Sequence, residues 1–228
     1  MSRVPFGVLI SGSGTNLQAL IDAAASPDYP GRLAVVVSNR RDALGLERAR
    51  SAGIPARWIP HRKKAREDFE REVLDVLDEH DVEWVALAGF MRMLTPTFLD
   101  AFPGRLLNIH PSLLPAFPGL NGPRQALERG VRIAGATVHF VIPEMDAGPI
   151  LLQGAVPVLD GDTEADLKER ILSVEHRIYP RALALALSGQ AQLEGQRVRL
   201  PDDQPGWLWD AGGGGGRPVR GGGPESRP

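Results

Sequence analysis

Hydrophobic residues along this chain follow two patterns that alternate with one another. Candidate strands, most of them short unbroken apolar runs typical of strands buried on both faces, lie at 6–10, 33–39, 56–59, 84–88, 106–107, 136–141 and 150–158. Segments with apolar residues at helical spacing lie at 17–21, 43–52, 66–80, 124–129 and 163–187. Because strands alternate with helices, the order predicts an α/β fold built on a parallel sheet with right-handed crossovers.

The length of 228 residues suits one domain with a substantial core. We expect residues 1–201 to form this domain, as a Rossmann-like, mostly parallel twisted sheet flanked by helices. Gly53 is expected to end the second helix, and Thr163 to cap the last one. Beyond residue 201 the composition changes, and residues 211–228 are almost entirely Gly, Pro, Arg, Ser and Glu. Such a stretch buries too little apolar area to offset its ordering entropy, so 202–228 is predicted to be a disordered tail.

The composition of the chain argues against several classes of partner and site. A formal net charge of −2 gives no support for a broad surface that binds nucleic acid or an anionic membrane. The chain has no cysteine, which excludes disulfides, thiolate nucleophiles and cysteine-based metal sites. The five histidines show no metal-binding spacing, so we expect no metal. The N-terminus is unlike a signal peptide and no apolar run approaches the roughly 20 residues of a membrane span, so we expect a cytoplasmic protein.

A glycine-rich turn follows the first expected strand, with Gly12 and Gly14 in the segment 11–16. Free backbone amides at the start of the next helix can surround a phosphate there. The dinucleotide-binding fingerprint is incomplete, because Leu17 stands where its third glycine would lie. The turn therefore favours a single phosphate, with an ordinary turn of an α/β unit as the alternative.

An amide and an imidazole follow the strand at 106–107, in the Pro-rich segment 108–115. Side chains two positions apart in extended chain point the same way, so Asn108 and His110 can enter one pocket. Two converging donors suit an oxygen that gains negative charge during a reaction. The alternative is turn chemistry beside a histidine whose hydrogen bonds are satisfied locally.

Several other polar residues fit either a functional or a structural role. The loop 89–94 is apolar with one arginine, which fits either the wall of a pocket for a flat aromatic ligand or core packing. His139 lies inside an expected strand, where a histidine is more often structural. Glu175 and His176 lie in the middle of the last helix, where such a pair is usually at the surface. The loops 11–16, 89–94 and 108–119 all follow strands, and ligands of open α/β sheets bind beyond the carboxyl ends of strands.

Taken together, four motifs resemble those of the phosphoribosylglycinamide formyltransferase family, over roughly residues 4–200. The motifs lie at 11–16, 88–92, 108–115 and 146–149. The resemblance implies the formyltransferase fold. Methionyl-tRNA formyltransferases add a large C-terminal domain and formyltetrahydrofolate hydrolases an N-terminal regulatory domain, and we expect neither here.

The resemblance also implies a reaction, in which the formyl group of 10-formyltetrahydrofolate passes to the amine of glycinamide ribonucleotide during de novo purine biosynthesis. Asn108, His110 and Asp146 match the catalytic positions of the family. The formyl-folate would be a co-substrate, the partners would be small molecules, and the chain would be a monomer or homodimer. The alternatives are a formyltetrahydrofolate hydrolase and a noncatalytic module that binds a phosphate metabolite.

Further positions take their expected roles from the resemblance. Gly14, Thr15 and Asn16 match the phosphate site, and Glu175 matches a residue that contacts the same substrate at its ribose. The positions that match the folate site are Arg66, Met91, Arg92, Met93, Leu94, Asn108, Ile142, Pro143, Glu144, Met145 and Asp146. The Leu114–Pro115 bond is expected to be cis. The chain departs from the family at 121–123, where Asn-Gly-Pro replaces a segment that carries histidines in relatives.

Overall fold

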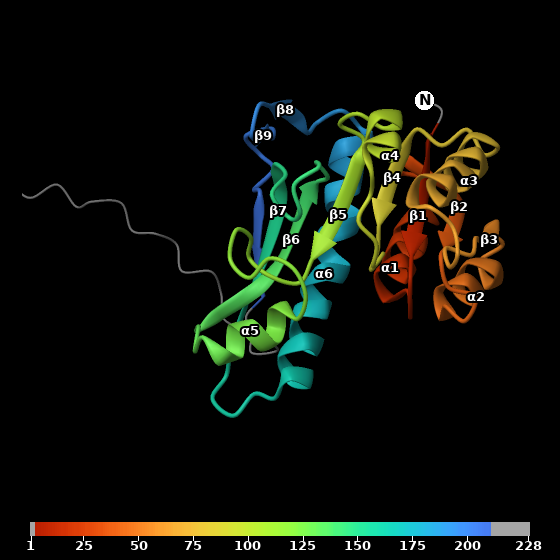
Figure 1. The fold of residues 1–228 in the computed structure, drawn as a ribbon. Coiled ribbons are helices and arrows are strands. Elements are labelled where there is room, and N and C mark those ends of the chain that lie inside the picture. The colour runs from red at the N-terminus through yellow and green to blue at the C-terminus, as the bar shows by residue number, and fades with distance from the viewer. Residues whose placement is uncertain (1–2, 211–228) are drawn as a thin grey trace, which may run out of the picture.

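The computed structural model describes residues 3–210, which form one α/β unit around an eight-stranded sheet (Figure 1). The order of strands across this sheet is β10-β7-β6-β5-β4-β1-β2-β3. Its strands are β1 (Val4–Ile10), β2 (Gly31–Ser38), β3 (Ala56–Trp58), β4 (Trp84–Leu87), β5 (Leu106–His110), β6 (Ile133–Phe140), β7 (Ile150–Pro157) and β10 (Trp207–Trp209). A separate two-stranded hairpin consists of β8 (Gln192–Glu194) and β9 (Arg197–Arg199).

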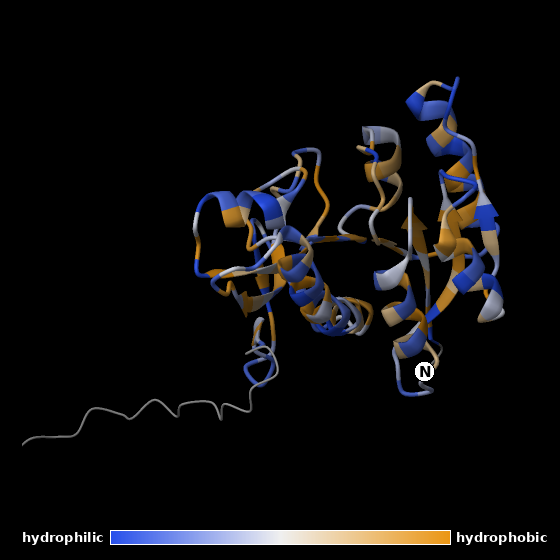
Figure 2. Ribbon diagram, turned by 90° about the horizontal axis from the view of Figure 1, so that it is seen from below, coloured by the Kyte–Doolittle hydropathy of each residue, from blue (hydrophilic) through white to orange (hydrophobic). Residues whose placement is uncertain are grey.

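Helices cover both faces of the sheet. They are α1 (Thr15–Ala24), α2 (Leu44–Ser51), α3 (Arg66–Asp78), α4 (Pro96–Ala101), α5 (Gly122–Glu128) and α6 (Glu164–Leu187). Buried residues of α1, α2, α5 and α6 belong to one core cluster, whereas those of α3 and α4 belong to a second cluster. Figure 2 shows the hydrophobic strands between the helices, whose outward sides carry more hydrophilic residues. Within residues 3–210, no helix is long and apolar enough to cross a membrane.

Strand direction changes part-way across the sheet. Strands β5, β4, β1, β2 and β3 run parallel to one another, while β6 pairs antiparallel with both β5 and β7. The chain moves from β1 outward to β2 on one side and later returns to β4 on the other. The loops after β1 and β4 therefore diverge, which leaves the crevice where ligands bind in open α/β sheets.

The expected fold class is confirmed, and most elements lie within a few residues of their predicted bounds. Gly53 has a φ of 72° just after α2, and Thr163 caps α6 in a capping box with Asp166. Helix α4 and the hairpin of β8 and β9 were not predicted, because their sequence signals are weak. Helix α4 has six residues, and the hairpin of β8 and β9 is mostly exposed.

The boundary expected at residue 201 is wrong for the segment that follows it. Strand β10 pairs in parallel with β7, and the amide of Asp210 donates to the Ala155 carbonyl at 2.9 Å. Trp207 and Trp209 alternate around Leu208, a composition that favours a strand. The sheet therefore extends into the predicted tail. The disorder expected at 211–228 lies outside the described residues.

Helix α6 is tied to the strands that carry the candidate site. The side chain of Tyr179 is fully buried, and its hydroxyl lies 2.9 Å from the Leu87 carbonyl and 3.2 Å from the Leu107 carbonyl. These carbonyls belong to β4 and β5, and Leu107 directly precedes Asn108. Because a buried hydroxyl needs a partner, this contact fixes α6 against the sheet beside the candidate catalytic residues.

Candidate active site

Strand β5 is longer than the apolar run suggested and carries both candidate catalytic side chains. It extends to His110, so Asn108 and His110 lie within the strand instead of in the following loop. Their antiparallel partners on β6 are His139 for Asn108 and Thr137 for His110. Pairing on both sides of β5 holds the two side chains at fixed positions on one face.

Asp146 reaches this face from the loop between β6 and β7. Its Oδ2 lies 3.5 Å from Nδ1 of His110 and accepts a hydrogen bond from the Gly119 amide at 2.8 Å. The backbone of Asp146 has a φ of 53°, a left-handed conformation that aspartate tolerates better than most residues. The carboxylate is 11% exposed. A residue 36 positions after His110 thus meets it inside the protein.

Both ring nitrogens of His110 face oxygen atoms. Nε2 lies 3.0 Å from the carbonyl of Phe117, which can only accept, so Nε2 donates. Nδ1 faces the Asp146 carboxylate. Phe117 has a φ of 55°, which is strained for a large residue, and its loop therefore sits against the imidazole in a sparsely populated conformation.

His139 is part of the same cluster, although the sequence favoured a purely structural role. Its Nδ1 donates to the Phe140 carbonyl at 2.9 Å, and Nε2 lies 3.1 Å from the amide nitrogen of Asn108. Burial lowers the pKa of His139, which the Phe140 carbonyl and the Asp146 carboxylate oppose in part. A neutral ring that donates through Nδ1 accepts through Nε2, so it accepts from Asn108. The missing signal was the β5–β6 register, which puts His139 opposite Asn108.

The glycine-rich turn has the geometry of an anion site. Helix α1 begins at Thr15, directly after Gly14, whose φ is 70°. A Cβ on Gly14 would lie 2.7 Å from the Cα of Gly45 at the start of α2, so any side chain at this position would force the two backbones apart. Because the first backbone amides of a helix have no partner within it, the α1 amides at this turn are available to an anion.

Glu175 is buried beside this turn, which corrects the expectation that it lies at the surface. It is 6% exposed, and its Oε2 accepts a hydrogen bond from Nδ2 of Asn16 at 2.7 Å. Burial raises the pKa of Glu175 to about 7, and the hydrogen bond from Asn16 opposes this shift. In the part of the chain that the structure describes, the buried Oδ1 of Asn16 has no hydrogen-bond partner. His176 is only half-buried.

The residues expected at a folate site divide between two loops and one helix end. Met91 and Met93 are exposed by 70% and 44%, and Arg92 places its guanidinium 5.2 Å from the ring centre of Phe69 on α3. Leu94 packs against the second core cluster, as does Val141, which precedes the loop 142–146. Both loops are thus anchored on one core. Arg66 is exposed as the first residue of α3, one turn before Phe69.

In the loop after β5, one detail matches an expectation. The Leu114–Pro115 bond is cis. Asn121 precedes α5 with a φ of 62°, a conformation that asparagine accepts readily. Its side chain is exposed.

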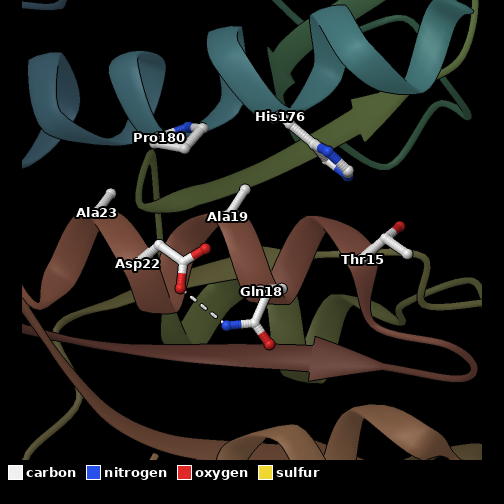
Figure 3. A pocket seen from close by; sticks show the side chains of 7 residues that line it. All are labelled: Thr15, Gln18, Ala19, Asp22, Ala23, His176 and Pro180. Atoms are coloured by element: carbon white, nitrogen blue, oxygen red, sulfur yellow. Dashed lines mark hydrogen bonds between the residues drawn. The ribbon is translucent and has the colours of Figure 1, made fainter.

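A hollow of about 400 Å³ lies between α1 and α6 (Figure 3). It is lined by Thr15, Gln18, Ala19, Asp22, Ala23, His176 and Pro180. Thr15 is the one member that also belongs to the expected phosphate site. Asn108, His110 and Asp146 do not line this hollow, so its location is distinct from the catalytic cluster.

Comparison with known proteins agrees with this geometry. A family model described as "Formyl transferase" matches residues 5–183. The phosphoribosylglycinamide formyltransferase of Escherichia coli (strain K12) is 48% identical over 199 residues, which cover 84% of this chain and 94% of that relative. The chain belongs to the phosphoribosylglycinamide formyltransferase family. The resemblance found in the sequence motifs is therefore confirmed.

Relatives of this family differ in length. The human trifunctional purine biosynthetic protein adenosine-3 is 51% identical over 187 residues, which are 82% of this chain but 18% of that protein. The chain thus spans less than a fifth of this trifunctional relative. A solved structure of glycinamide ribonucleotide transformylase 1 from Symbiobacterium toebii has 55% identity and a TM-score of 0.86, with 88% of this chain and 95% of that one covered.

The formyltransferase fold is shared with a more distant enzyme. A formyltetrahydrofolate deformylase from Pseudomonas syringae has 28% identity and a TM-score of 0.82, over 88% of this chain and 67% of that one. The fold is therefore shared with an enzyme whose name denotes a different reaction.

Proposed function

We propose that this chain transfers the formyl group of 10-formyltetrahydrofolate to the amine of glycinamide ribonucleotide. The observation that carries the proposal is the meeting of Asn108, His110 and Asp146 at one face of β5. Membership of the family supports the choice of donor and acceptor. The side chains of Asn108 and His110 supply what formyl transfer needs, which is hydrogen-bond donors for the oxygen that gains negative charge.

In this proposal, attack of the amine on the formyl carbon forms a tetrahedral intermediate whose oxygen carries negative charge. One amide hydrogen of Asn108 is bound to His139. The other amide hydrogen donates to the oxygen of the intermediate. His110 stabilises the same charge as an imidazolium. In the described state the Phe117 carbonyl holds Nε2 of His110, so the substrates have to displace this carbonyl.

Collapse of the intermediate breaks its bond to the folate nitrogen, which needs a proton. His110 gives its Nε2 proton to that nitrogen as general acid. The attacking amine loses a proton, which the Asp146 carboxylate accepts directly or through water. Asp146 also holds the imidazole through Nδ1. One proton is gained and one is released, so the transfer is balanced without an outside reactant.

The substrates occupy opposite sides of this cluster. The acceptor phosphate binds at Gly14, Thr15 and Asn16, and its ribose hydroxyls bind Glu175. The pterin of the donor packs between the loops 89–94 and 142–146. The cations Arg66 and Arg92 meet the acidic tail of the folate, and an ion pair at each would strengthen donor binding. The monomer or homodimer state and the cytoplasmic location stay predictions.

The proposal is tested by incubating the full chain with the folate donor, with and without glycinamide ribonucleotide, and following the donor by absorbance. We expect donor consumption only when the ribonucleotide is present, with formylated ribonucleotide as product. Release of formate without the acceptor would identify a hydrolase instead. Transfer to methionyl-tRNA in a parallel reaction would identify a different acceptor, and absence of any turnover would leave a binding module.

A further inference from the structure

The loop after β4 is hydrogen-bonded to the buried hydroxyl of Ser11. The backbone amide of Met91 donates to Oγ of Ser11 at 2.9 Å, and this hydroxyl donates in turn to Oδ1 of Asn39 at 2.7 Å. Ser11 is 5% exposed and Asn39 is 6% exposed. Removal of the Ser11 hydroxyl would therefore leave the Met91 amide without this partner in a partly buried place.

A buried carboxylate holds the other end of the same loop. Glu70 on α3 is 1% exposed, and its Oε1 accepts the backbone amide of Thr95 at 2.9 Å. Its Oε2 accepts the hydroxyl of Thr95. Thr95 is the residue before α4, and its hydroxyl makes no cap bond within that helix because it is committed to Glu70.

Between these two anchors the side chains of two methionines are exposed. Met91 and Met93 are 70% and 44% exposed, so their large apolar surfaces are free to meet a ligand. Arg92 is held over Phe69, one residue before Glu70 on α3. The backbone of the loop is thus fixed at both ends, Leu94 packs against the core, and Met91 and Met93 stay exposed.

We infer that Ser11 and Glu70 are positioning residues that hold the loop 89–95 in the shape that binds the donor. The inference rests on the proposed function, in which this loop lines the pterin site. If either anchor is lost, the loop spends part of its time in other shapes, and the apparent affinity falls by the fraction of competent molecules. Once the donor is bound, the loop is ordered again, so turnover at saturation changes little.

Steady-state kinetics of folded variants separate this role from a general loss of structure. Glu70→Ala is expected to raise the KM for the donor about tenfold, because an unsatisfied buried donor costs that order of free energy. The kcat and the KM for the acceptor should stay within about twofold of wild type on the same principle. Ser11→Ala is expected to change the donor KM in the same direction, although Ser11 belongs to the turn proposed for the acceptor.

Conservative and distant variants serve as controls. Glu70→Gln keeps an acceptor for the Thr95 amide and should restore most of the donor affinity. Asp75→Ala changes an exposed carboxylate on the same helix and should match wild type. If Glu70→Ala does not fold, Thr95→Val decides the question, because it removes the hydroxyl contact alone.

The results that would overturn the inference are equally specific. They are an unchanged donor KM in folded Glu70→Ala or Thr95→Val, and a fall in kcat with a parallel rise in both KM values. A Ser11→Ala variant that changes only the acceptor KM would also contradict it. If the wild-type chain transfers no formyl group at all, the proposed function fails. If the wild type is active but the variants keep its donor KM, only the positioning role fails.

Discussion

The orientation of one amide decides what the cluster on β5 can do. His139 donates through Nδ1 to a backbone carbonyl, and its buried ring is neutral, so Nε2 accepts from Asn108. The Asn108 amide group is therefore turned with its nitrogen toward His139. The second N–H of Asn108 is then available to a substrate oxygen. His139 on β6 thus sets the orientation of the Asn108 amide on β5.

Replacement of His139 should disturb Asn108 without touching the substrate. His139→Ala removes the acceptor, so the Asn108 amide can rotate and present its oxygen. We expect kcat to fall about tenfold in a folded protein, the cost of one misplaced donor. His139→Gln offers a side-chain oxygen as acceptor and should recover part of the rate. Unchanged turnover in folded His139→Ala would contradict this role.

Glu175 gives a second prediction for a single residue, concerning stability against pH. Its pKa in the folded protein is about 7, above the ordinary 4.5. The folded state therefore binds more protons between these values, and stability falls as pH rises through about 7. The free energy of unfolding of wild type, minus that of Glu175→Gln, should be about 2–3 kcal/mol smaller at pH 8 than at pH 5.

Urea unfolding of both proteins at the two pH values measures this difference. The glutamine variant is the matched control, because it keeps an acceptor for Asn16 but cannot titrate. An offset between the two proteins that is the same at pH 5 and pH 8 would mean that the buried carboxyl does not titrate in this range.

Among the elements, the start of α1 depends on a close approach of two glycines. Gly14 has a positive φ and its missing Cβ makes room for Gly45 of α2. Arg48 of α2 reinforces the contact by donating to the Ser13 carbonyl at 2.9 Å. The position of the α1 amides is thus set by a neighbouring helix as well as by the turn itself.

Gly14→Ala tests this arrangement, with Gly53→Ala as control. Both positions have a positive φ, so both variants should lose about 1–2 kcal/mol of stability from conformation. Only at Gly14 does a new Cβ meet backbone, since nothing lies within 4 Å of a Cβ at Gly53. We expect Gly14→Ala to lose more stability and to raise the acceptor KM. Equal melting temperatures and an unchanged acceptor KM would contradict the phosphate site.

For the whole molecule, the alternation of strands and helices was enough to predict the fold class and the edge where the loops gather. It could not predict how β6, β7 and β10 extend the sheet, because pairing and direction depend on contacts between distant segments. The place of His139 was missed for this reason. The burial of Glu175 was missed because α6 packs against both α1 and the sheet, which its own sequence does not reveal.

The site itself was predicted more fully than its surroundings, since Asn108, His110 and Asp146 were expected together and lie together. Their contacts were not predictable in the same way. His110 is hydrogen-bonded to the Phe117 carbonyl, and Asp146 accepts the Gly119 amide. Both contacts depend on the conformation of the loop after β5. That loop brings strained backbone to the cluster at Phe117, which no local pattern of residue types indicates.

The central claim is that Asn108 and His110 act on the reacting formyl group, and turnover of their alanine variants tests it most directly. The measurement is kcat for formyl transfer with donor and acceptor both saturating, alongside the melting temperature of each variant. We expect Asn108→Ala and His110→Ala each to lose on the order of 100-fold in kcat while melting close to wild type. Near-normal turnover in either folded variant would contradict it.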